Sequence, residues 1–462
     1  MSNKSIDLGK GNIGKLLFTL AIPTIIGQLV NLLYNIIDRI FIGKMDSGDL
    51  AMAGVGVAMP IILLVSAFAM LFAAGGAPLT AIEMGKQDNE KAEEIMSNCF
   101  SMLICGGIVL TIVFLLFKEP ILWAFGASNV TIGYGLDYLS IYLVGTIFVQ
   151  ISLGMNLFIN TQGFTKIGMF TVIIGAAINM VLDPILIFGF NMGVKGAALA
   201  TIIAQGVSAI FVLKFLFGKK SILKIRKRYL KINKKLALSI VALGVAPFIM
   251  QATESLVLVS LNNQLLKYGG DLAVGAMTIM SSVMQVIMMP LMGLTQGAQP
   301  IMSYNFGARE MTRVKKTFKL LFVICLSYSA LMVLSIMIFP EVFVSIFNNK
   351  PELVEITSWA MRIYFGGMCL FGAQIACQQT FLALGQAKTS LIIAMLRKIV
   401  LLVPLIFILP MFIEDGLTAV LLAEPIADII SIIITVIIFT VFYKKTFNNN
   451  KEENRNEVIN NI

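Results

Sequence analysis

Residues 51–80 read AMAGVGVAMPIILLVSAFAMLFAAGGAPLT, thirty consecutive residues without a charged side chain. A helix rises about 1.5 Å per residue, so this stretch covers about 45 Å, more than the ~30 Å hydrocarbon core of a bilayer. Backbone hydrogen bonds inside that core must be satisfied within the segment, and an α-helix satisfies them. The stretch therefore predicts a transmembrane helix.

The whole chain has the composition of an integral membrane protein. Hydrophobic residues make up 58% of its 462 positions and charged residues 13%, and the mean hydropathy is +0.89. Soluble domains carry about 25% charged residues. Apolar segments bounded by polar clusters lie at 14–43, 51–80, 93–117, 131–160, 165–189, 194–217, 237–266, 271–302, 314–339, 353–384, 389–411 and 417–443. We predict an all-α integral membrane fold with twelve transmembrane helices.

The distribution of Lys and Arg over the loops predicts the orientation. The loops that join each odd-numbered segment to the next contain five such residues, Lys44, Lys118, Lys195, Lys267 and Lys350, whereas the termini and the other loops contain twenty-five. Cytoplasmic loops carry the excess of positive charge. We therefore expect both termini in the cytoplasm, in a multi-pass protein of the cell membrane. The short polar N-terminus leads directly into an apolar segment, so no cleavable signal peptide is expected.

A basic connector, residues 218–236, divides the chain and holds nine Lys and Arg residues between Lys219 and Lys235. We expect it to be a solvated cytoplasmic loop that touches anionic lipid headgroups. Because this location explains much of the net charge of +10, no nucleic-acid partner is expected. Residues 444–462 are expected to form a polar cytoplasmic tail.

The sequences on the two sides of the connector repeat one another. Matching residues recur at a shift of 222, namely Gly48-Asp49-Leu50-Ala51 as Gly270-Asp271-Leu272-Ala273, Pro78 as Pro300, Gly85 as Gly307, and Gly163 and Lys166 as Gly385 and Lys388, while Pro23 matches Pro247 at a shift of 224. The parts 1–217 and 237–443 each hold six segments, so both six-helix bundles have the same orientation. This parallel repeat predicts two bundles around a central V-shaped cavity suited to alternating access.

Ionisable side chains inside the hydrocarbon are costly, so each is a functional candidate. Asn31, Tyr34 and Asp38 are spaced by three and four residues and share one face of the first helix. Asn179 and Asp183 are one turn apart on the fifth helix and face the same way.

Three polar side chains also lie at one predicted depth. Ala197 and Thr201 form a further pair at one-turn spacing on the sixth helix. Counted from the outer ends of their segments, Asp38, Asp183 and Thr201 lie six to eight residues deep, about 9–12 Å at 1.5 Å per residue. Two carboxylates, an amide and a hydroxyl at this depth predict a site for a hard cation or a proton.

A purely structural role is the alternative for both carboxylates. Asp38 is followed by Arg39 and could pair with it near the interface, and Asp183-Pro184 could form only a helix-end turn. Adjacent helical residues point about 100° apart, which disfavours the first of these pairings.

Other charges fall in the segments of the second half, namely Arg362, Arg397, Lys398, Glu424 and Asp428. Glu424 and Asp428 are one turn apart. We predict that they pair with Arg397 or Lys398 as an interhelical ion pair that stabilises the second half. Contact with a cationic substrate is the alternative.

The chain resembles the multidrug and toxic compound extrusion (MATE) family over residues 10–445, almost its whole length. The residues that carry the resemblance are Asn35, Asp38 and Phe41-Ile42-Gly43, then Asn179 with Asp183-Pro184, then Gly193-Val194, Gly196-Ala197-Ala198 and Thr201. The resemblance implies a transporter that exports drugs and organic cations against an inward gradient of Na+ or H+.

The DinF-type branch of that family implies the site residues. Its coupling site would consist here of Asp38, Asn179, Asp183 and Thr201, with Ala197 beside them, and the first four would ligate Na+ in a sodium-coupled protein. Asn31, Tyr34 and Asn156 match positions that line the substrate cavity of the first half. Gln374 and Gln378 are cavity candidates in the second half because buried amides need partners.

The chain departs from the NorM-type branch, which relies on acidic residues in its second half. Glu254 lies one residue before the matching position, which would turn its side chain by about 100°. The aspartate of helix ten has no clear match within 366–380. We therefore assign the coupling site to the first half.

The composition argues against enzymatic chemistry. The chain has no histidine, the commonest general base and metal ligand. Its five cysteines lie in apolar segments without a CxxC pattern and are expected to be small buried hydrophobes. We expect a monomeric transporter of amphipathic or cationic drugs in the lipid bilayer, with no cofactor besides the coupling ion. The alternative is a flippase of lipids or lipid-linked oligosaccharides from the same superfamily, which would be expected to have a strongly basic cavity.

Overall fold

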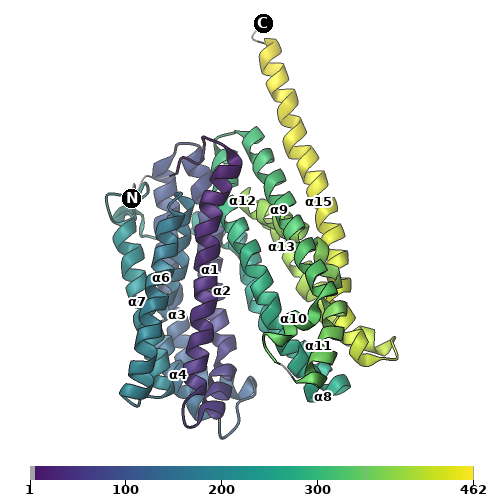
Figure 1. Ribbon diagram of the computed structural model, residues 1–462. Coiled ribbons are helices and arrows are strands. Elements are labelled where there is room, and N and C mark those ends of the chain that lie inside the picture. Colours follow the sequence, from purple (N-terminus) through teal and green to yellow (C-terminus); the bar gives the residue numbers. More distant parts are fainter. Residues whose placement is uncertain (1–5, 349, 461–462) are drawn as a thin grey trace. The chain divides into compact units, whose positions relative to one another are not determined.

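The computed structural model describes residues 6–348 and 350–460, and these residues form helices and no strands. The first part of the chain contains α1 (Ile13–Gly43), α2 (Gly48–Gly85), α3 (Asn89–Ala124), α4 (Ile132–Val144), α5 (Thr146–Thr161), α6 (Thr165–Pro184) and α7 (Val194–Leu216). The second part contains α8 (Lys234–Gly307), α9 (Met311–Ile338), α10 (Pro340–Ser345), α11 (Pro351–Tyr364), α12 (Phe371–Ala383), α13 (Ala387–Met395), α14 (Val403–Ile408) and α15 (Gly416–Asn460) (Figure 1).

Twelve membrane spans are present in the part of the chain that the structure describes. Nine continuous helical stretches there are long and apolar enough to cross a bilayer, and two bent pairs, α4 with α5 and α11 with α12, each supply one more span. The 74 residues of α8 would extend about 110 Å if unbroken, but Gly270 interrupts them with φ 65° and ψ −167°. Counting α8 as two spans gives the predicted twelve. The predicted all-α, twelve-helix fold is confirmed.

The shift of 222 residues recurs in the helix boundaries. Three pairs of helices begin at this separation: α3 and α9 at Asn89 and Met311, α6 and α13 at Thr165 and Ala387, and α7 and α15 at Val194 and Gly416. The turns before the first two of these pairs repeat as well. Left-handed backbone occurs at Gln87 and Arg309 (φ 64° and 61°) and at Gly163 and Gly385 (φ 82° and 72°). Both halves therefore repeat the same helices and the same tight turns.

The two bent spans also correspond. The α4–α5 span bends by 58° at Gly145, and the α11–α12 span bends by 45° at Phe365, directly before the 3-10 segment Gly366–Leu370. A Cβ on Gly145 would lie 2.5 Å from the side chain of Ile202 in α7, and a Cβ on Gly367 would lie 2.7 Å from the backbone of Pro425 in α15. Thus a glycine at or next to each bend allows close contact with the last span of its half, α7 or α15.

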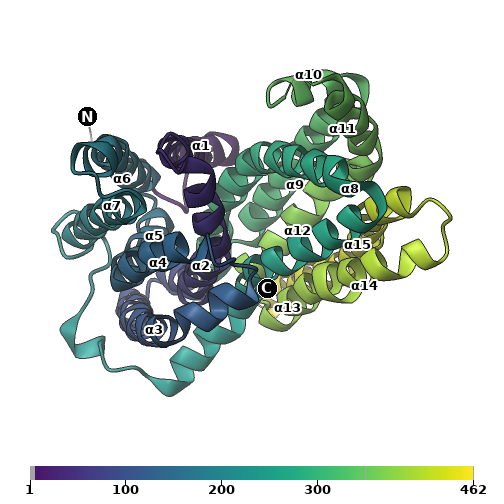
Figure 2. The same ribbon diagram turned by 90° about the horizontal axis from the view of Figure 1, so that it is seen from below.

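The structure divides into two compact units. One runs to Ala252 and adds Met292–Ala308 and Leu382–Lys388, and the other comprises Thr253–Leu291, Arg309–Phe381 and the chain from Thr389 onward. In the first unit α1 packs on α6, and α2 packs on α3 and α5 (Figure 2). The domain boundaries at 217, 236 and 443 stay predictions.

The basic connector is docked on the first unit, which corrects the expectation of a solvated loop. Its Leu223 and Ile225 are 0% and 5% exposed and join the core formed by α2, α3 and α5. Its backbone is held too, because Leu223 N donates to Gln162 Oε1 at 2.8 Å and Lys224 N donates to Glu93 Oε1 at 2.9 Å. Most of its basic side chains, Lys219 and Lys220 among them, are exposed as expected. Ile222, Leu230 and Ile232 are exposed as well.

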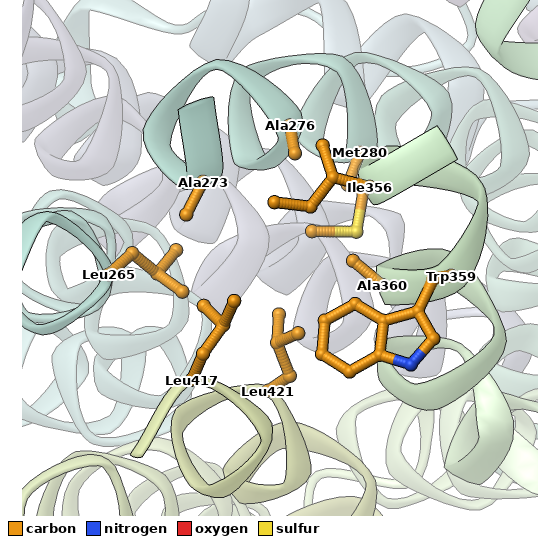
Figure 3. Close-up of a pocket in the computed structure, with 9 residues that line it drawn as sticks. All are labelled: Leu265, Ala273, Ala276, Met280, Ile356, Trp359, Ala360, Leu417 and Leu421. Carbon is orange, nitrogen blue, oxygen red and sulfur yellow. The ribbon is translucent and has the colours of Figure 1, made fainter. Parts of the chain in front are cut away.

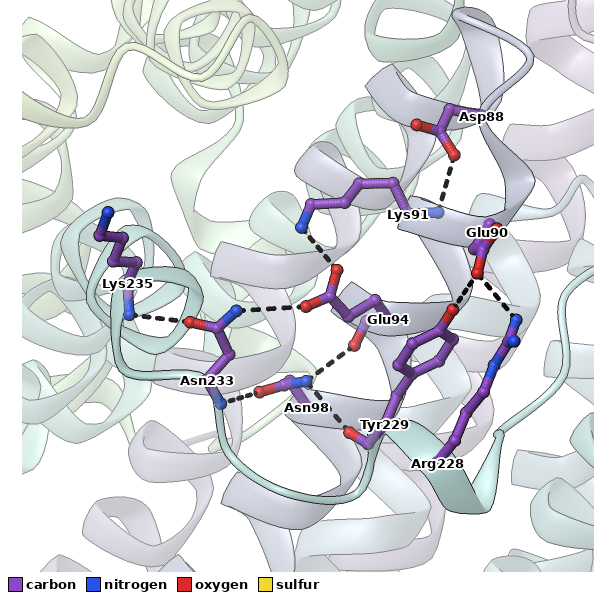
Figure 4. Close-up of polar contacts among 9 residues, drawn as sticks. All are labelled: Asp88, Glu90, Lys91, Glu94, Asn98, Arg228, Tyr229, Asn233 and Lys235. Carbon is purple, nitrogen blue, oxygen red and sulfur yellow. Dashed lines mark hydrogen bonds and ion pairs between the residues drawn. The ribbon is translucent and has the colours of Figure 1, made fainter.

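The end of the connector is held by a polar network at the start of α3 (Figure 4). Glu90 accepts hydrogen bonds from Tyr229 and, at 3.0 Å, from Arg228. Asn233, the N-cap of α8, binds α3 through its backbone N–H, which donates to Asn98 Oδ1 at 2.7 Å. The Tyr229 hydroxyl donates to a carboxylate, so the pKa of Tyr229 is raised above its ordinary value.

The cysteines only partly match their prediction. Cys99, Cys325 and Cys377 are buried, Cys369 is half-buried and Cys105 is exposed. Cys105 lies in α3, a membrane span, so its exposed side chain is still in an apolar part of the chain.

Candidate functional site

Three of the predicted coupling residues lie together between α6 and α7. Asn179 Nδ2 donates to Asp183 Oδ1 at 3.2 Å, one turn along α6, and to Thr201 Oγ1 on α7 at 3.4 Å. Asn179, Asp183 and Thr201 are 1%, 0% and 6% exposed. Ala197 is fully buried one turn before Thr201. These contacts form a small polar site within an apolar helix interface.

The fourth residue, Asp38, reaches this site from α1. The carboxyl groups of Asp38 and Asp183 lie close enough to share a hydrogen bond when one of them is protonated. If both carboxyl groups are ionised, one buried oxygen of each, Asp38 Oδ1 and Asp183 Oδ2, accepts no hydrogen bond. Two buried like charges repel each other, and neutralising one of them by a proton or a cation removes that cost.

The alternative pairing of Asp38 with Arg39 is not seen. Arg39 is exposed, and the described residues contain no salt bridge between the two side chains. This agrees with their roughly 100° separation around the helix.

Local backbone features position the α6 side of the site. Asp183 lies in the last turn of α6, and a π-helical segment, Ile185–Gly189, follows Pro184. Proline removes a backbone donor, and π-helical turns often occur at functional sites. A Cβ on Gly196 would lie 2.8 Å from the backbone of Leu186, so this glycine allows α7 to approach the π-helical segment. This close approach favours the contact between Thr201 and Asn179.

The structure adds polar residues that the sequence reasoning missed. The Tyr138 hydroxyl, on α4, lies within hydrogen-bond reach of Thr201. Tyr34 interacts in the same way with Gln205, whose Oε1 accepts a hydrogen bond from Ser152. Gln205 follows Thr201 by four residues, so helical spacing alone could have placed it on the same face of α7. No comparable spacing links Tyr138 to the site.

The predicted substrate-cavity residues have varied surroundings. Asn31 and Tyr34 on α1 are half-buried. Asn156 is also half-buried and donates to Gly168 O at 3.3 Å. In the second unit, Gln374 donates to Ser431 Oγ at 2.8 Å, and Gln378 donates to Ser390 Oγ at 2.8 Å. These two amides tie α12 to α15 and α13, and their role in a cavity stays a prediction.

An apolar pocket in the second unit lacks groups for recognising an ion. It is lined by Leu265, Ala273, Ala276, Met280, Ile356, Trp359, Ala360, Leu417 and Leu421 (Figure 3). The only polar side-chain atom in this lining is the indole nitrogen of Trp359. We assign no function to this pocket.

The predicted interhelical ion pair of the second half is confirmed. Arg397 binds both carboxylates of α15, through Nε to Asp428 Oδ1 at 2.6 Å and through Nη2 to Glu424 Oε1 at 2.8 Å. Lys398 pairs with Glu254 on α8. Arg397 and Lys398 lie in a π-helical segment, Leu396–Leu402.

The chemistry of the first-unit site suits a hard cation or a proton. Asp38, Asn179, Asp183 and Thr201 offer carboxylate, amide and hydroxyl oxygens, the donor type that hard cations prefer. In the described part of the chain, no three His, Cys, Asp or Glu side chains gather as a metal cluster. The predicted Na+ site, with its two carboxylates, is not of that kind and stays a prediction.

Comparisons with known proteins identify the family. The MatE family model matches residues 23–185 and 245–408, and the two matched segments begin 222 residues apart. The multidrug export protein MepA of Staphylococcus haemolyticus (strain JCSC1435) is 27% identical over 91% of this chain and 92% of its own length. A solved structure of the MATE multidrug transporter DinF-BH, determined as a complex, is 34% identical, has a TM-score of 0.88, and is matched over 96% of this chain and 99% of that one.

A second solved structure shares the fold at lower identity. It shows the outward-facing conformation of a multidrug resistance MATE family transporter of the MOP superfamily and has a TM-score of 0.88 at 22% identity, over 96% of this chain and 99% of that one. The match of the family model to both halves, including most of α1 and all of α6, shows that the chain belongs to the MatE family, the multidrug and toxic compound extrusion transporters.

Proposed function

We propose that this protein exports amphipathic or cationic drugs across the cell membrane in exchange for Na+ or H+. Relatives named as multidrug export proteins support drug export. The related DinF-BH, whose structure is 34% identical in sequence, is likewise named a multidrug transporter. The observation that carries the coupling proposal is the facing pair Asp38 and Asp183, each with a buried oxygen that lacks a donor.

The coupling ion would act on the contact between α1 and α6. A proton or Na+ that enters from outside neutralises one of the two carboxylates and draws Asp38 toward Asp183. Asn179 holds Asp183 in place from the same helix, and the Thr201 hydroxyl offers a further oxygen. When the ion leaves, repulsion between the carboxylates favours separation of α1 from α6.

Movement of α1 would link ion binding to substrate release. Asn31 and Tyr34 share the face of α1 that bears Asp38. A shift of α1 on ion binding therefore changes the surface that they offer to a drug, which favours release outward. The empty protein then returns to the inward-facing state. Both termini are expected in the cytoplasm, and the transporter is expected to work as a monomer.

Transport in proteoliposomes tests this proposal. Ethidium movement is measured with a Na+ gradient and a pH gradient imposed separately, and the gradient that drives efflux identifies the ion. Asp38→Asn and Asp183→Asn should each abolish gradient-driven efflux, because each removes one of the paired charges. Asp137→Asn is the matched control, since Asp137 is a half-exposed carboxylate that pairs with Lys195 at 3.3 Å. Retained efflux in both site variants contradicts the proposed site, and lipid flipping without dye efflux favours the flippase alternative.

A further inference from the structure

The connector between α7 and α8 presents apolar as well as basic side chains at its surface. Ile222, Leu230 and Ile232 are between 36% and 42% exposed. The exposed apolar surface continues onto both adjoining spans, since Phe217 directly after α7 and Leu238 in the second turn of α8 are exposed too. Closely spaced apolar side chains at a surface indicate contact with a membrane or with another apolar surface.

The docked backbone holds these apolar side chains outward. Ile222 is exposed although the next residue, Leu223, is fully buried against the first unit. The carbonyl of Leu230 accepts a hydrogen bond from Ser101 Oγ on α3 at 2.7 Å, while the side chain of Leu230 stays exposed. The exposure of Ile222 and Leu230 is therefore a property of the docked connector.

The connector also carries positive charge that the protein does not neutralise. It contains nine Lys and Arg residues and no Asp or Glu. Arg226 pairs with Glu93 at 2.7 Å and Arg228 pairs with Glu90 at 3.0 Å. Six exposed lysines form no ion pair with any residue that the structure describes, namely Lys219, Lys220, Lys227, Lys231, Lys234 and Lys235. These six unpaired lysines are available to a partner with negative charge.

The position of the connector favours a membrane as that partner. Both α7 and α8 are membrane spans, so the chain that joins them lies at a membrane surface. The connector runs around the outer side of α3, at the edge of the first unit (Figure 2). A bilayer offers anionic headgroups and apolar acyl chains side by side at such an edge. A nucleic acid or an acidic protein would match the lysines alone and leave Ile222 and Leu230 in water.

We propose that the connector is an interfacial anchor that binds anionic phospholipids. Ile222, Leu230 and Ile232 enter the boundary between headgroups and acyl chains, and the six unpaired lysines bind the lipid phosphates. Because the connector is docked on α3, this contact holds the first unit at the membrane surface. The inference concerns lipid binding and does not rest on the proposed transport function.

Fluorescence quenching by brominated lipids tests this inference on the full-length protein. The sequence has two tryptophans, and the background variant Trp123→Phe/Trp359→Phe removes both. Ile222→Trp then places a single indole in the connector. The protein is inserted into vesicles of equal parts phosphatidylcholine and phosphatidylglycerol, with the acyl chains of one lipid brominated at a time. Brominated phosphatidylglycerol should quench the indole about twofold or more as strongly as brominated phosphatidylcholine, and high salt should reduce the difference.

A second indole position and two sets of lysine variants are the controls. Leu116→Trp, in the same background, replaces an exposed apolar residue of α3 far from the start of that helix, where the connector docks, and both lipids should quench it equally. With Ile222→Trp present, replacing Lys219, Lys220, Lys227 and Lys231 by Gln should abolish the preference for phosphatidylglycerol. Replacing the same four by Arg keeps the charge and should retain the preference. Thermal unfolding should find both sets as stable as the background, because these side chains are exposed and unpaired.

The proposal is overturned by any of three outcomes. Equal quenching of the Ile222→Trp protein by the two brominated lipids would show that the connector does not select anionic lipid. No quenching by either lipid would place residue 222 in water. A preference for phosphatidylglycerol that survives the four substitutions by Gln would show that the lysines do not recognise the headgroup.

Discussion

Asn179 donates a hydrogen bond of 3.2 Å to Oδ1 of Asp183, one turn further along α6, while Oδ2 of the same carboxylate has no donor. The amide thus orients the carboxylate and leaves one oxygen for an ion. The same Nδ2 also reaches Thr201. Asn179 is therefore the residue through which α6 and α7 jointly position Asp183.

Replacing Asn179 by Ala should weaken binding of the coupling ion without unfolding the protein. A hydrogen bond to a charged group contributes about 1.5–3 kcal/mol, which corresponds to a ~10- to 100-fold change in affinity. The measurement is the concentration of Na+ or H+ that gives half-maximal ethidium efflux in proteoliposomes. Asp137→Asn serves again as the control. An unchanged half-maximal concentration in Asn179→Ala would remove this residue from the site.

Thr201 can be tested by a matched pair of substitutions. Thr201→Val keeps the shape and removes the hydroxyl, whereas Thr201→Ser keeps the hydroxyl and removes a methyl group. If the hydroxyl supplies an oxygen to the ion, Thr201→Val should lower the ion affinity about tenfold and Thr201→Ser should stay near the parent value. Equal effects of the two variants would indicate that Thr201 acts only through packing.

Hydrophobicity and repeat spacing were enough to predict the architecture. The apolar segments located the twelve spans, and the shift of 222 reappears in helix starts such as Thr165 and Ala387. The contact between Asn179 and Asp183 also followed from their four-residue spacing on one helix. Each of these features follows from the spacing of residues along the chain and needs no knowledge of how the helices pack.

Contacts between distant helices could not be predicted in the same way. Tyr138 approaches Thr201, and Glu254 pairs with Lys398 144 residues away, because of how each helix is rotated against its neighbours. The connector was missed for a related reason. Its composition is basic, but the alternating Leu223 and Ile225 bury against the first unit while the intervening backbone binds Glu93.

The two bent spans make a prediction about packing. Gly145→Ala should destabilise the protein by about 1–3 kcal/mol because the new methyl group overlaps the side chain of Ile202. Truncating that neighbour in Gly145→Ala/Ile202→Ala should recover part of the loss. Gly367→Ala meets the backbone of Pro425 instead, so no side-chain truncation there can relieve it. Thermal unfolding of the three variants in detergent measures the effect, and the absence of any recovery in the double variant contradicts the assigned contact.

The docking of the connector predicts its sensitivity to protease and to pH. Trypsin should cut the folded protein at exposed Lys219 or Lys220 and spare the bond after Lys224, because the neighbouring backbone is hydrogen-bonded and Leu223 and Ile225 are buried. Glu93→Ala removes the acceptor for Lys224 N and Arg226, and cleavage after Lys224 should become several-fold faster.

The pH dependence follows from Tyr229. Its pKa is raised above the ordinary value of 10.0 by the hydrogen bond to Glu90. The contribution of this bond to docking is therefore fully present below about pH 10 and is lost as the pH rises through the raised pKa. Cleavage of the 224–231 segment should accelerate over that range in the parent protein. Tyr229→Phe, which cannot donate this bond, should show faster cleavage already at neutral pH and no further step. A parent protein without any step in alkaline buffer would show that Tyr229 does not hold the connector.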